Sequence, residues 1–109
     1  MKGLGLDDEA GALAFYRAVD DPAARVVLDF LIDRPGQRAD GAAIAKALGL
    51  PRNTDVARAA YAMGEIAGGL GHGRPWTEAQ LGYAMPEEQA ALLRAARSRL
   101  AGDAGAAPG

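Results

Sequence analysis

The side chains best suited to bind a ligand in this sequence are basic, and half of the 12 Lys and Arg residues lie between residues 34 and 76. That stretch has a net charge of +3, whereas residues 1–33 carry −4 and residues 77–109 carry −1. Ammonium and guanidinium groups bind phosphates, and cations gathered on one segment of an acidic chain are typical of a nucleic-acid binder. The basic residues of this segment are Arg34, Arg38, Lys46, Arg52, Arg58 and Arg74.

Three consecutive residues, Arg52, Asn53 and Thr54, have side chains that can read DNA bases. They precede a helical pattern, and Arg58 follows one turn later. Arg and Asn make bidentate hydrogen bonds with guanine and adenine edges, so a helix entering the major groove would carry them on its first turns. The alternative is a structural role, in which Asn53 or Thr54 caps the helix and Arg52 is only solvated.

Arg74 follows the segment Gly71-His72-Gly73 and is predicted to lie at a hairpin tip that meets phosphate or the minor groove. The glycines permit this close approach, although they equally permit an ordinary turn. His72 has no second His and no Cys as a partner in the sequence, so we expect an exposed loop residue rather than a metal ligand.

No arrangement typical of catalysis is recognisable in the sequence. Ser98 and the scattered Thr residues have no His at a suggestive position, and neither a phosphate loop nor zinc-ligand spacing is present. We therefore expect a protein that is not an enzyme and that uses no cofactor or metal.

Aromatic residues are few, and Trp76, Tyr83 and Phe15 admit two interpretations. They could form a ligand-binding cluster. We favour a structural role, in which Trp76 and Tyr83 face each other across a hairpin and cover a core built largely from Ala.

The elements that would position these residues follow from caps, breakers and apolar spacing. Asp21-Pro22 and Asp40 are strong helix starts, and Gly49 is typical of a left-handed C-terminal cap. Residues 1–6 are expected to be frayed, and residues 102–109 to be a disordered tail. The expected helices cover residues 7–20, 21–34, 41–48, 53–70 and 86–101, and the expected strands cover 74–77 and 81–85, with 37–39 extended.

The order of these elements resembles a winged helix. Residues 31–36 and 41–50 are similar to the opening of bacterial winged-helix proteins, whose pattern Leu-Ala-x-x-Leu-Gly-Leu marks the first helix of the motif and its turn. Residues 83–97 resemble the strand and last helix of MarR-type regulators. The chain is also similar to small actinobacterial proteins that have an Arg-Pro-Gly turn, a Pro-Trp pair and a Tyr-x-Met triplet. The resemblance implies one mainly α domain over residues 1–101, with a short β-hairpin wing and flanking N- and C-terminal helices.

Two functions are compatible with this fold. The first is a DNA-binding transcriptional regulator, in which the helix after Pro51 enters the major groove of double-stranded DNA and Arg38, Lys46, Arg58 and Arg74 anchor phosphates. The second is a protein–protein module that uses the long Ala-rich helix as its contact face. A modest core favours a homodimer through the N-terminal helix and residues 86–101. The absence of a signal peptide, of Cys and of a long apolar run predicts a soluble cytoplasmic protein with no membrane partner.

Overall fold

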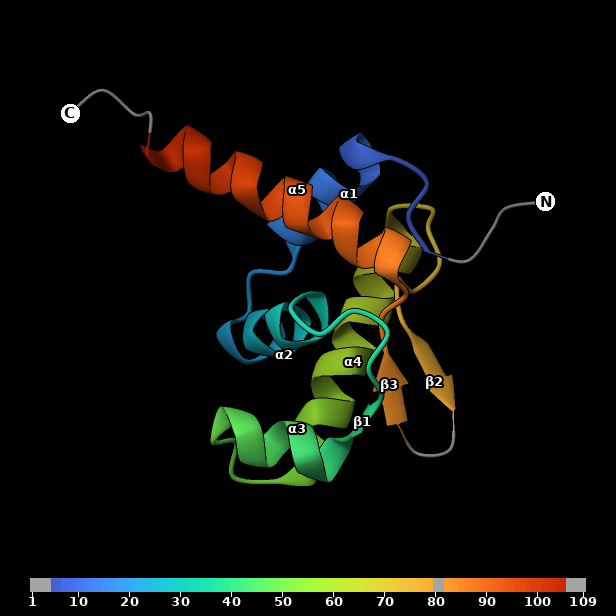
Figure 1. Ribbon diagram of the computed structural model, residues 1–109, viewed down its shortest axis with the longest axis vertical. Helices are drawn as coiled ribbons and strands as arrows, with labels where there is room; N and C mark the ends of the chain where they lie inside the picture. The colour runs from blue at the N-terminus through green and yellow to red at the C-terminus, as the bar shows by residue number, and fades with distance from the viewer. Residues whose placement is uncertain (1–4, 80–81, 106–109) are drawn as a thin grey trace.

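The computed structural model describes residues 5–79 and 82–105, which contain five helices and three short strands. In Figure 1, α1 and α5 lie at one end of the molecule and α3 lies at the other. The expectation of a mainly α fold is confirmed. The elements, in chain order, are α1 (Glu9–Ala18), α2 (Pro22–Ile32), β1 (Ala39–Asp40), α3 (Gly41–Leu48), α4 (Asn53–Gly69), β2 (Thr77–Ala79), β3 (Gly82–Ala84) and α5 (Glu87–Gly105).

The sheet is antiparallel, with the strand order β1-β3-β2. Its hairpin strands begin later than the sequence indicated, and Leu81, which we placed in the second strand, lies outside the described residues. Tyr83 pairs with Glu78 on one side and with Ala39 on the other. The expected direct pairing of Trp76 with Tyr83 is therefore wrong, because the register sets Tyr83 opposite Glu78.

Three helices begin where an aspartate accepts a hydrogen bond from a backbone N–H group of the first turn. Asp8 accepts from Gly11 at 2.8 Å, and Asp21 accepts from Ala24 at 3.0 Å. Asp40 accepts from Ala43 at 2.7 Å. These bonds satisfy N–H groups that have no partner inside the helix. The starts expected at Asp21 and Asp40 are confirmed.

The helix α4 begins differently from the structural alternative that the sequence offered. The N-cap is Arg52, whose backbone N–H donates to the carboxylate of Asp55 at 3.0 Å. The side chains of Asn53 and Thr54 are exposed within the first turn. The prediction that one of these two caps the helix is wrong, because Asp55 reaches back from inside the helix to satisfy the N-cap.

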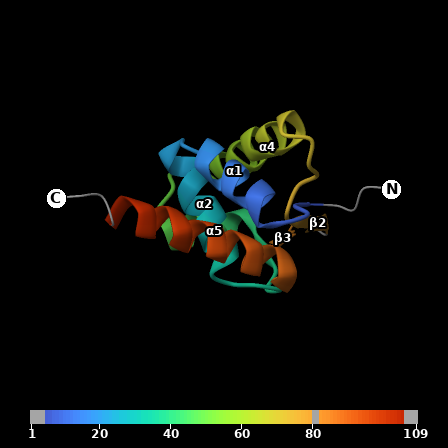
Figure 2. The same cartoon turned by 90° about the horizontal axis from the view of Figure 1, so that it is seen from above.

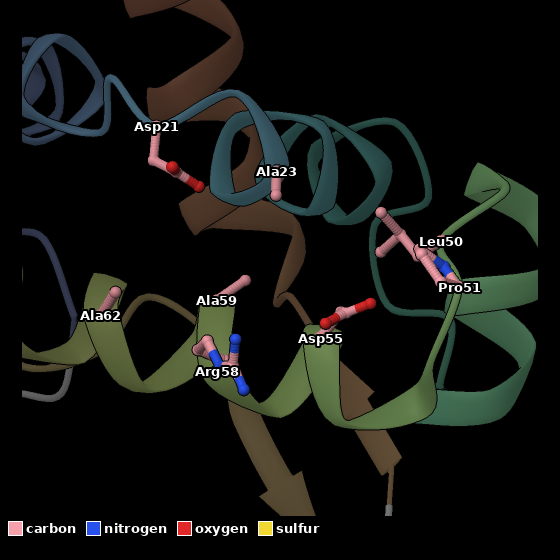
Figure 3. Close-up of a pocket in the computed structure, with 8 residues that line it drawn as sticks. All are labelled: Asp21, Ala23, Leu50, Pro51, Asp55, Arg58, Ala59 and Ala62. Carbon is pink, nitrogen blue, oxygen red and sulfur yellow. The ribbon is translucent and has the colours of Figure 1, made fainter.

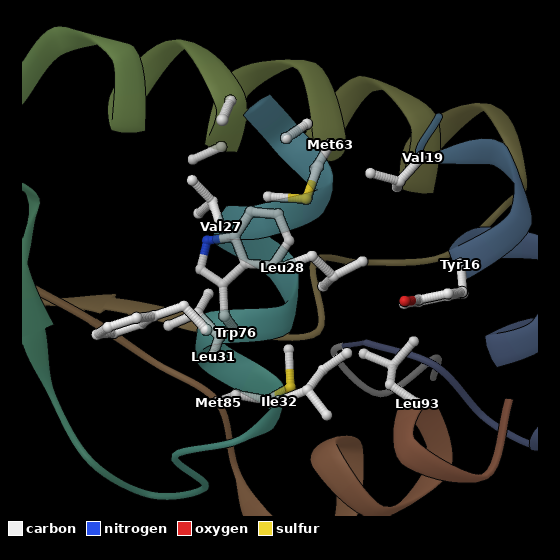
Figure 4. Packing of buried hydrophobic residues seen from close by; sticks show 14 of the residues in the cluster. Tyr16, Val19, Val27, Leu28, Leu31, Ile32, Met63, Trp76, Met85 and Leu93 are labelled. Carbon is white, nitrogen blue, oxygen red and sulfur yellow. The ribbon is translucent and has the colours of Figure 1, made fainter. Parts of the chain in front are cut away.

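The core lies where α1, α2, α4 and α5 meet, and it is richer in large side chains than the Ala content suggested. Figure 4 shows Trp76 in this cluster among Val27, Leu28 and Met63, and Trp76 is only 4% exposed. The buried apolar stripe expected on α4 is confirmed for Val56, Ala59, Ala60, Met63 and Ala67. Leu70, which we placed on the same stripe, is 42% exposed because the helix ends before it.

The N-terminal segment is held to α5 by a side chain. Gln89 accepts a hydrogen bond from the backbone N–H of Leu6 at 2.7 Å and donates to its carbonyl oxygen at 3.0 Å. Gly5 precedes this contact with a φ of +87°, and Leu6 is 3% exposed. The expectation of a frayed start is wrong for residues 5 and 6, since the side-chain amide of Gln89 binds both backbone polar groups of Leu6. Residues 1–4 lie outside the described part.

Replacing Gln89 with Met should destabilise the protein because two backbone groups of Leu6 lose their buried partner while the volume is roughly kept. Each unsatisfied buried group costs about 1–3 kcal/mol. We expect a loss of about 2 kcal/mol in the free energy of unfolding, measured by urea denaturation. Gln37→Met, at an exposed position, is the matched control. Equal midpoints for the two variants would contradict this role.

The helices α1 and α5 pack against each other and share the core with α2, as the two perpendicular views show (Figures 1 and 2). Arg97 of α5 bridges Asp33 at 2.7 Å and Asp29 at 3.3 Å, and the hydrogen bond to Asp33 is the main cause that raises the pKa of Arg97. Tyr16 of α1 donates to Asp29 at 2.9 Å. Burial, followed by that hydrogen bond, raises the pKa of Tyr16.

This packing changes what was expected of the two terminal helices. On the two helices expected to form a homodimer, the side chains of Phe15 and Leu93 are buried within one chain. These two side chains are therefore not available for a dimer interface, and the homodimer stays a prediction. In addition, α5 continues to Gly105, so residues 102–105 are helical instead of part of a disordered tail. Residues 106–109 lie outside the described part.

Candidate nucleic-acid interface

The helices α3 and α4 pack against each other through a tight connection. Gly49 adopts a left-handed φ of +69° and ends α3, as the sequence indicated. The backbone N–H of Leu50 then donates to the carbonyl oxygen of Ala45 at 2.9 Å. Buried Ile44 and Val56 contribute to the core from the two helices. This connection fixes α4 so that its first turns face solvent at the end of the molecule that carries α3 (Figure 1).

Five of the predicted site residues lie on these two helices and their connection. Lys46 on α3 is exposed, as are Arg52, Asn53, Thr54 and Arg58 at the start of α4. In the part of the chain that the structure describes, no ion pair or side-chain hydrogen bond holds Lys46, Arg52 or Arg58. Their charges are therefore available to an external anion.

Arginines elsewhere are engaged within the chain. Arg25 donates to the carbonyl oxygens of Val19 and Tyr16 at 2.8 and 2.9 Å. Arg34 stacks on the ring of Phe30, with 3.9 Å from its central carbon to the ring centroid. Arg94, Arg97 and Arg99 likewise bind groups on α2 or α1. The cations of α3 and α4 thus differ from most of the others in their lack of an intrachain role.

Arg38 lies apart from those cations, at the sheet. It immediately precedes β1, and its side-chain carbons cover Gly82 of β3, where a Cβ atom would come within 2.6 Å of them. The sequence alone could not place it there, because the contact depends on the pairing of β1 with β3.

Arg74 does not occupy the tip of the hairpin, so that prediction is wrong. It precedes β2, and the pairing of β2 with β3 runs from Thr77 to Ala79, away from Arg74. Its guanidinium donates to Glu78 at 3.1 Å and packs against Gly64 of α4, where a Cβ atom would lie 2.7 Å from Nε. The glycines before Arg74 end α4 instead of forming a tip.

His72 is half-buried, in contrast to the expected exposed loop residue. Its ring covers Gly11 of α1, where an added Cβ would lie 2.9 Å from Nε2. Its backbone N–H donates to the carbonyl oxygen of Ala67 at 2.9 Å. The residue therefore joins the end of α4 to α1.

Sequence reasoning missed the role of Glu78. One carboxylate oxygen of Glu78 accepts from Arg74 and also from the indole N–H of Trp76, the latter at 2.9 Å. Burial, followed by the negative charge of Glu78, raises the pKa of Tyr83 across the strand pair. The i, i+4 spacing of Arg74 and Glu78 was no signal for this pair, because that rule holds on helices and residues 74–78 run through a bend into β2.

Sequence reasoning also left Tyr61 without a role. Its side chain is 65% exposed in the middle of α4, and its hydroxyl makes no hydrogen bond among the described residues. The signal was present, because Tyr61 lies off the apolar stripe of the helix and on the side of Arg58.

A groove of about 560 Å³ separates the N-terminal half of α2 from α4 (Figure 3). Leu50 and Pro51 lie at one end of it. Three charged groups, Asp21, Asp55 and Arg58, lie among small apolar side chains. The groove is lined by Asp21, Ala23, Leu50, Pro51, Asp55, Arg58, Ala59 and Ala62.

No family model matches the sequence, and neither a curated protein nor a solved structure matches the chain. Within residues 5–79 and 82–105, no three His, Asp or Glu side chains gather as a metal site. No helix of the described chain combines the length and the apolar character needed to cross a bilayer.

Proposed function

We propose that this chain is a winged-helix protein that binds double-stranded DNA and regulates transcription. In this proposal α3 and α4 form the helix-turn-helix, α4 is the recognition helix, and β2 and β3 form the wing. The element order and the antiparallel sheet order β1-β3-β2 support this assignment. The proposed binding unit is one chain.

The observation that carries the proposal is the set of exposed cations near the connection between α3 and α4. Lys46, Arg52 and Arg58 have no intrachain partner in the described chain, whereas most other arginines stabilise helix ends or bridge helices. Neutralising phosphates with such cations releases counterions from the duplex, which supplies the main part of non-specific binding. Asn53 and Thr54 lie on the same turn as Arg52 and would face base edges.

A salt titration tests the proposal. We expect the affinity for a 20-base-pair duplex of random sequence, measured by fluorescence anisotropy, to fall with salt on a log–log plot. Three phosphate contacts predict a slope of about −2.7, since each contributes about −0.9. No binding at roughly 50 mM salt would contradict DNA binding.

A second function, a winged-helix protein that binds another protein and not DNA, is favoured by one observation. The groove between α2 and α4 is lined mainly by apolar side chains, so it could take an apolar side chain of a partner protein. The same titration separates the two functions, because a protein module would not bind a duplex with a salt-dependent affinity.

A further inference from the structure

We propose that Tyr61 reads the methyl group of a thymine in the major groove, one helical turn beyond Arg58, which contacts phosphate. This inference rests on the proposed function and assigns to Tyr61 the sequence preference of that site. Tyr61 has the most exposed of the large apolar side chains on the described surface, at 65%, compared with 40% for Val26.

The position of Tyr61 on α4 aligns it with the residues proposed to meet DNA. Thr54, Arg58 and Tyr61 are spaced at i, i+4 and i+7, which places them on one face of a helix. Arg58 and Tyr61 are separated by about 4.5 Å along the axis, at 1.5 Å for each residue. This separation is close to the roughly 3.4 Å step between neighbouring base pairs, so Tyr61 would lie about one step further along the duplex than Arg58.

The surroundings of Tyr61 leave the ring free to enter a groove. Its neighbours three and four residues away on the helix are Ala57 and Gly64, which have little or no side chain, and the longer Arg58 and Glu65. Tyr61 is the one aromatic residue of α4, and it is exposed. Small neighbours let the backbone approach the bases, while the ring reaches beyond them.

The order of charged residues along α4 limits the stretch of the helix that can face DNA. The cations Arg52 and Arg58 precede Tyr61, and Glu65 follows it by four residues on the same exposed side. A carboxylate is repelled by phosphates, so the first two and a half turns of the helix face the duplex and Tyr61 lies last among them. At this position an apolar ring fits the methyl group of thymine, which is the apolar feature of the major groove.

Replacing thymine with uracil tests this contact, because uracil lacks only that methyl group. A duplex is first selected from a randomised library with the unmodified protein, and each thymine is then replaced in turn. We expect one position where uracil weakens binding about fourfold, the value for one buried methyl group. Tyr61→Ala should bind the thymine and uracil duplexes equally, whereas Tyr61→Phe, which keeps the ring, should retain the difference.

Val26→Ala, which removes an exposed apolar side chain from α2, is the matched control and should behave like the parent. Discrimination by Tyr61→Ala equal to that of the parent would overturn the inference. Salt-dependent binding without any selected sequence would also overturn it, while the proposed DNA binding would stand. If no duplex binds at any salt concentration, the proposed function fails, and the inference fails with it.

Discussion

Trp76→Ala is expected to lower the free energy of unfolding by about 3–5 kcal/mol, the usual cost of truncating a buried aromatic side chain. The ring is 4% exposed and lies among Val27, Leu28 and Met63, so its removal would leave a cavity between α2 and α4 (Figure 4). A domain of this size has roughly 5–15 kcal/mol of total stability. Urea denaturation followed by circular dichroism measures the change.

Two further variants separate packing from hydrogen bonding at this site. Trp76→Phe keeps most of the apolar contact but loses the hydrogen bond to Glu78. Its free energy of unfolding should therefore fall by much less than that of the Ala variant. Glu78→Gln keeps an acceptor for the indole N–H and removes the charge that pairs with Arg74. An unchanged midpoint for Trp76→Ala would show that the ring does not support the core.

Replacing Arg52 and Arg58 together with Ala is expected to reduce the salt slope of duplex binding by about 1.8, since each lost phosphate contact removes about 0.9. The electrostatic contribution to affinity vanishes at roughly 1 M salt. At 0.1 M, the double variant should therefore bind the duplex about 60-fold more weakly than the parent. Both side chains are exposed and have no intrachain partner in the described chain, so the thermal midpoint should stay close to that of the parent.

The matched control removes two arginines from the opposite end of the molecule. Arg17 of α1 is exposed, and Arg99 of α5 makes a 3.6 Å ion pair with Glu9 that is open to solvent. Such surface pairs contribute little to stability. Arg17→Ala/Arg99→Ala changes the net charge by the same amount and should leave the slope unchanged. Equal slopes for the two double variants would show that binding follows net charge instead of the surface of α3 and α4.

The helix boundaries that could be predicted from the sequence depend on neighbouring residues. Asp21-Pro22, Asp40 and Gly49 act within one turn of their own position, so their roles were recognisable without tertiary information. The apolar spacing of α4 likewise identified its buried face, including Val56. These signals positioned α3 and α4, and they correctly indicated that Arg52 and Arg58 lie near the start of α4.

The features that the sequence did not predict depend on contacts between distant segments. Gln89 holds Leu6 across 83 positions of the chain, and no periodicity encodes that pair. Arg74 was placed at a tip because glycines precede it, but its position is set by the absence of a side chain at Gly64. The strand register, which sets Tyr83 opposite Glu78, likewise could not be predicted from the local sequence pattern.

The pairing of α1 with α5 has a consequence for synthesis on the ribosome. The inner face of α1, including Phe15, is covered in part by α5, which begins only at Glu87. At roughly 5–20 residues per second, translation of the intervening chain takes about 3–14 seconds. During that time the nascent chain exposes an apolar helix that the finished protein covers, and this interval is when a chaperone would bind it.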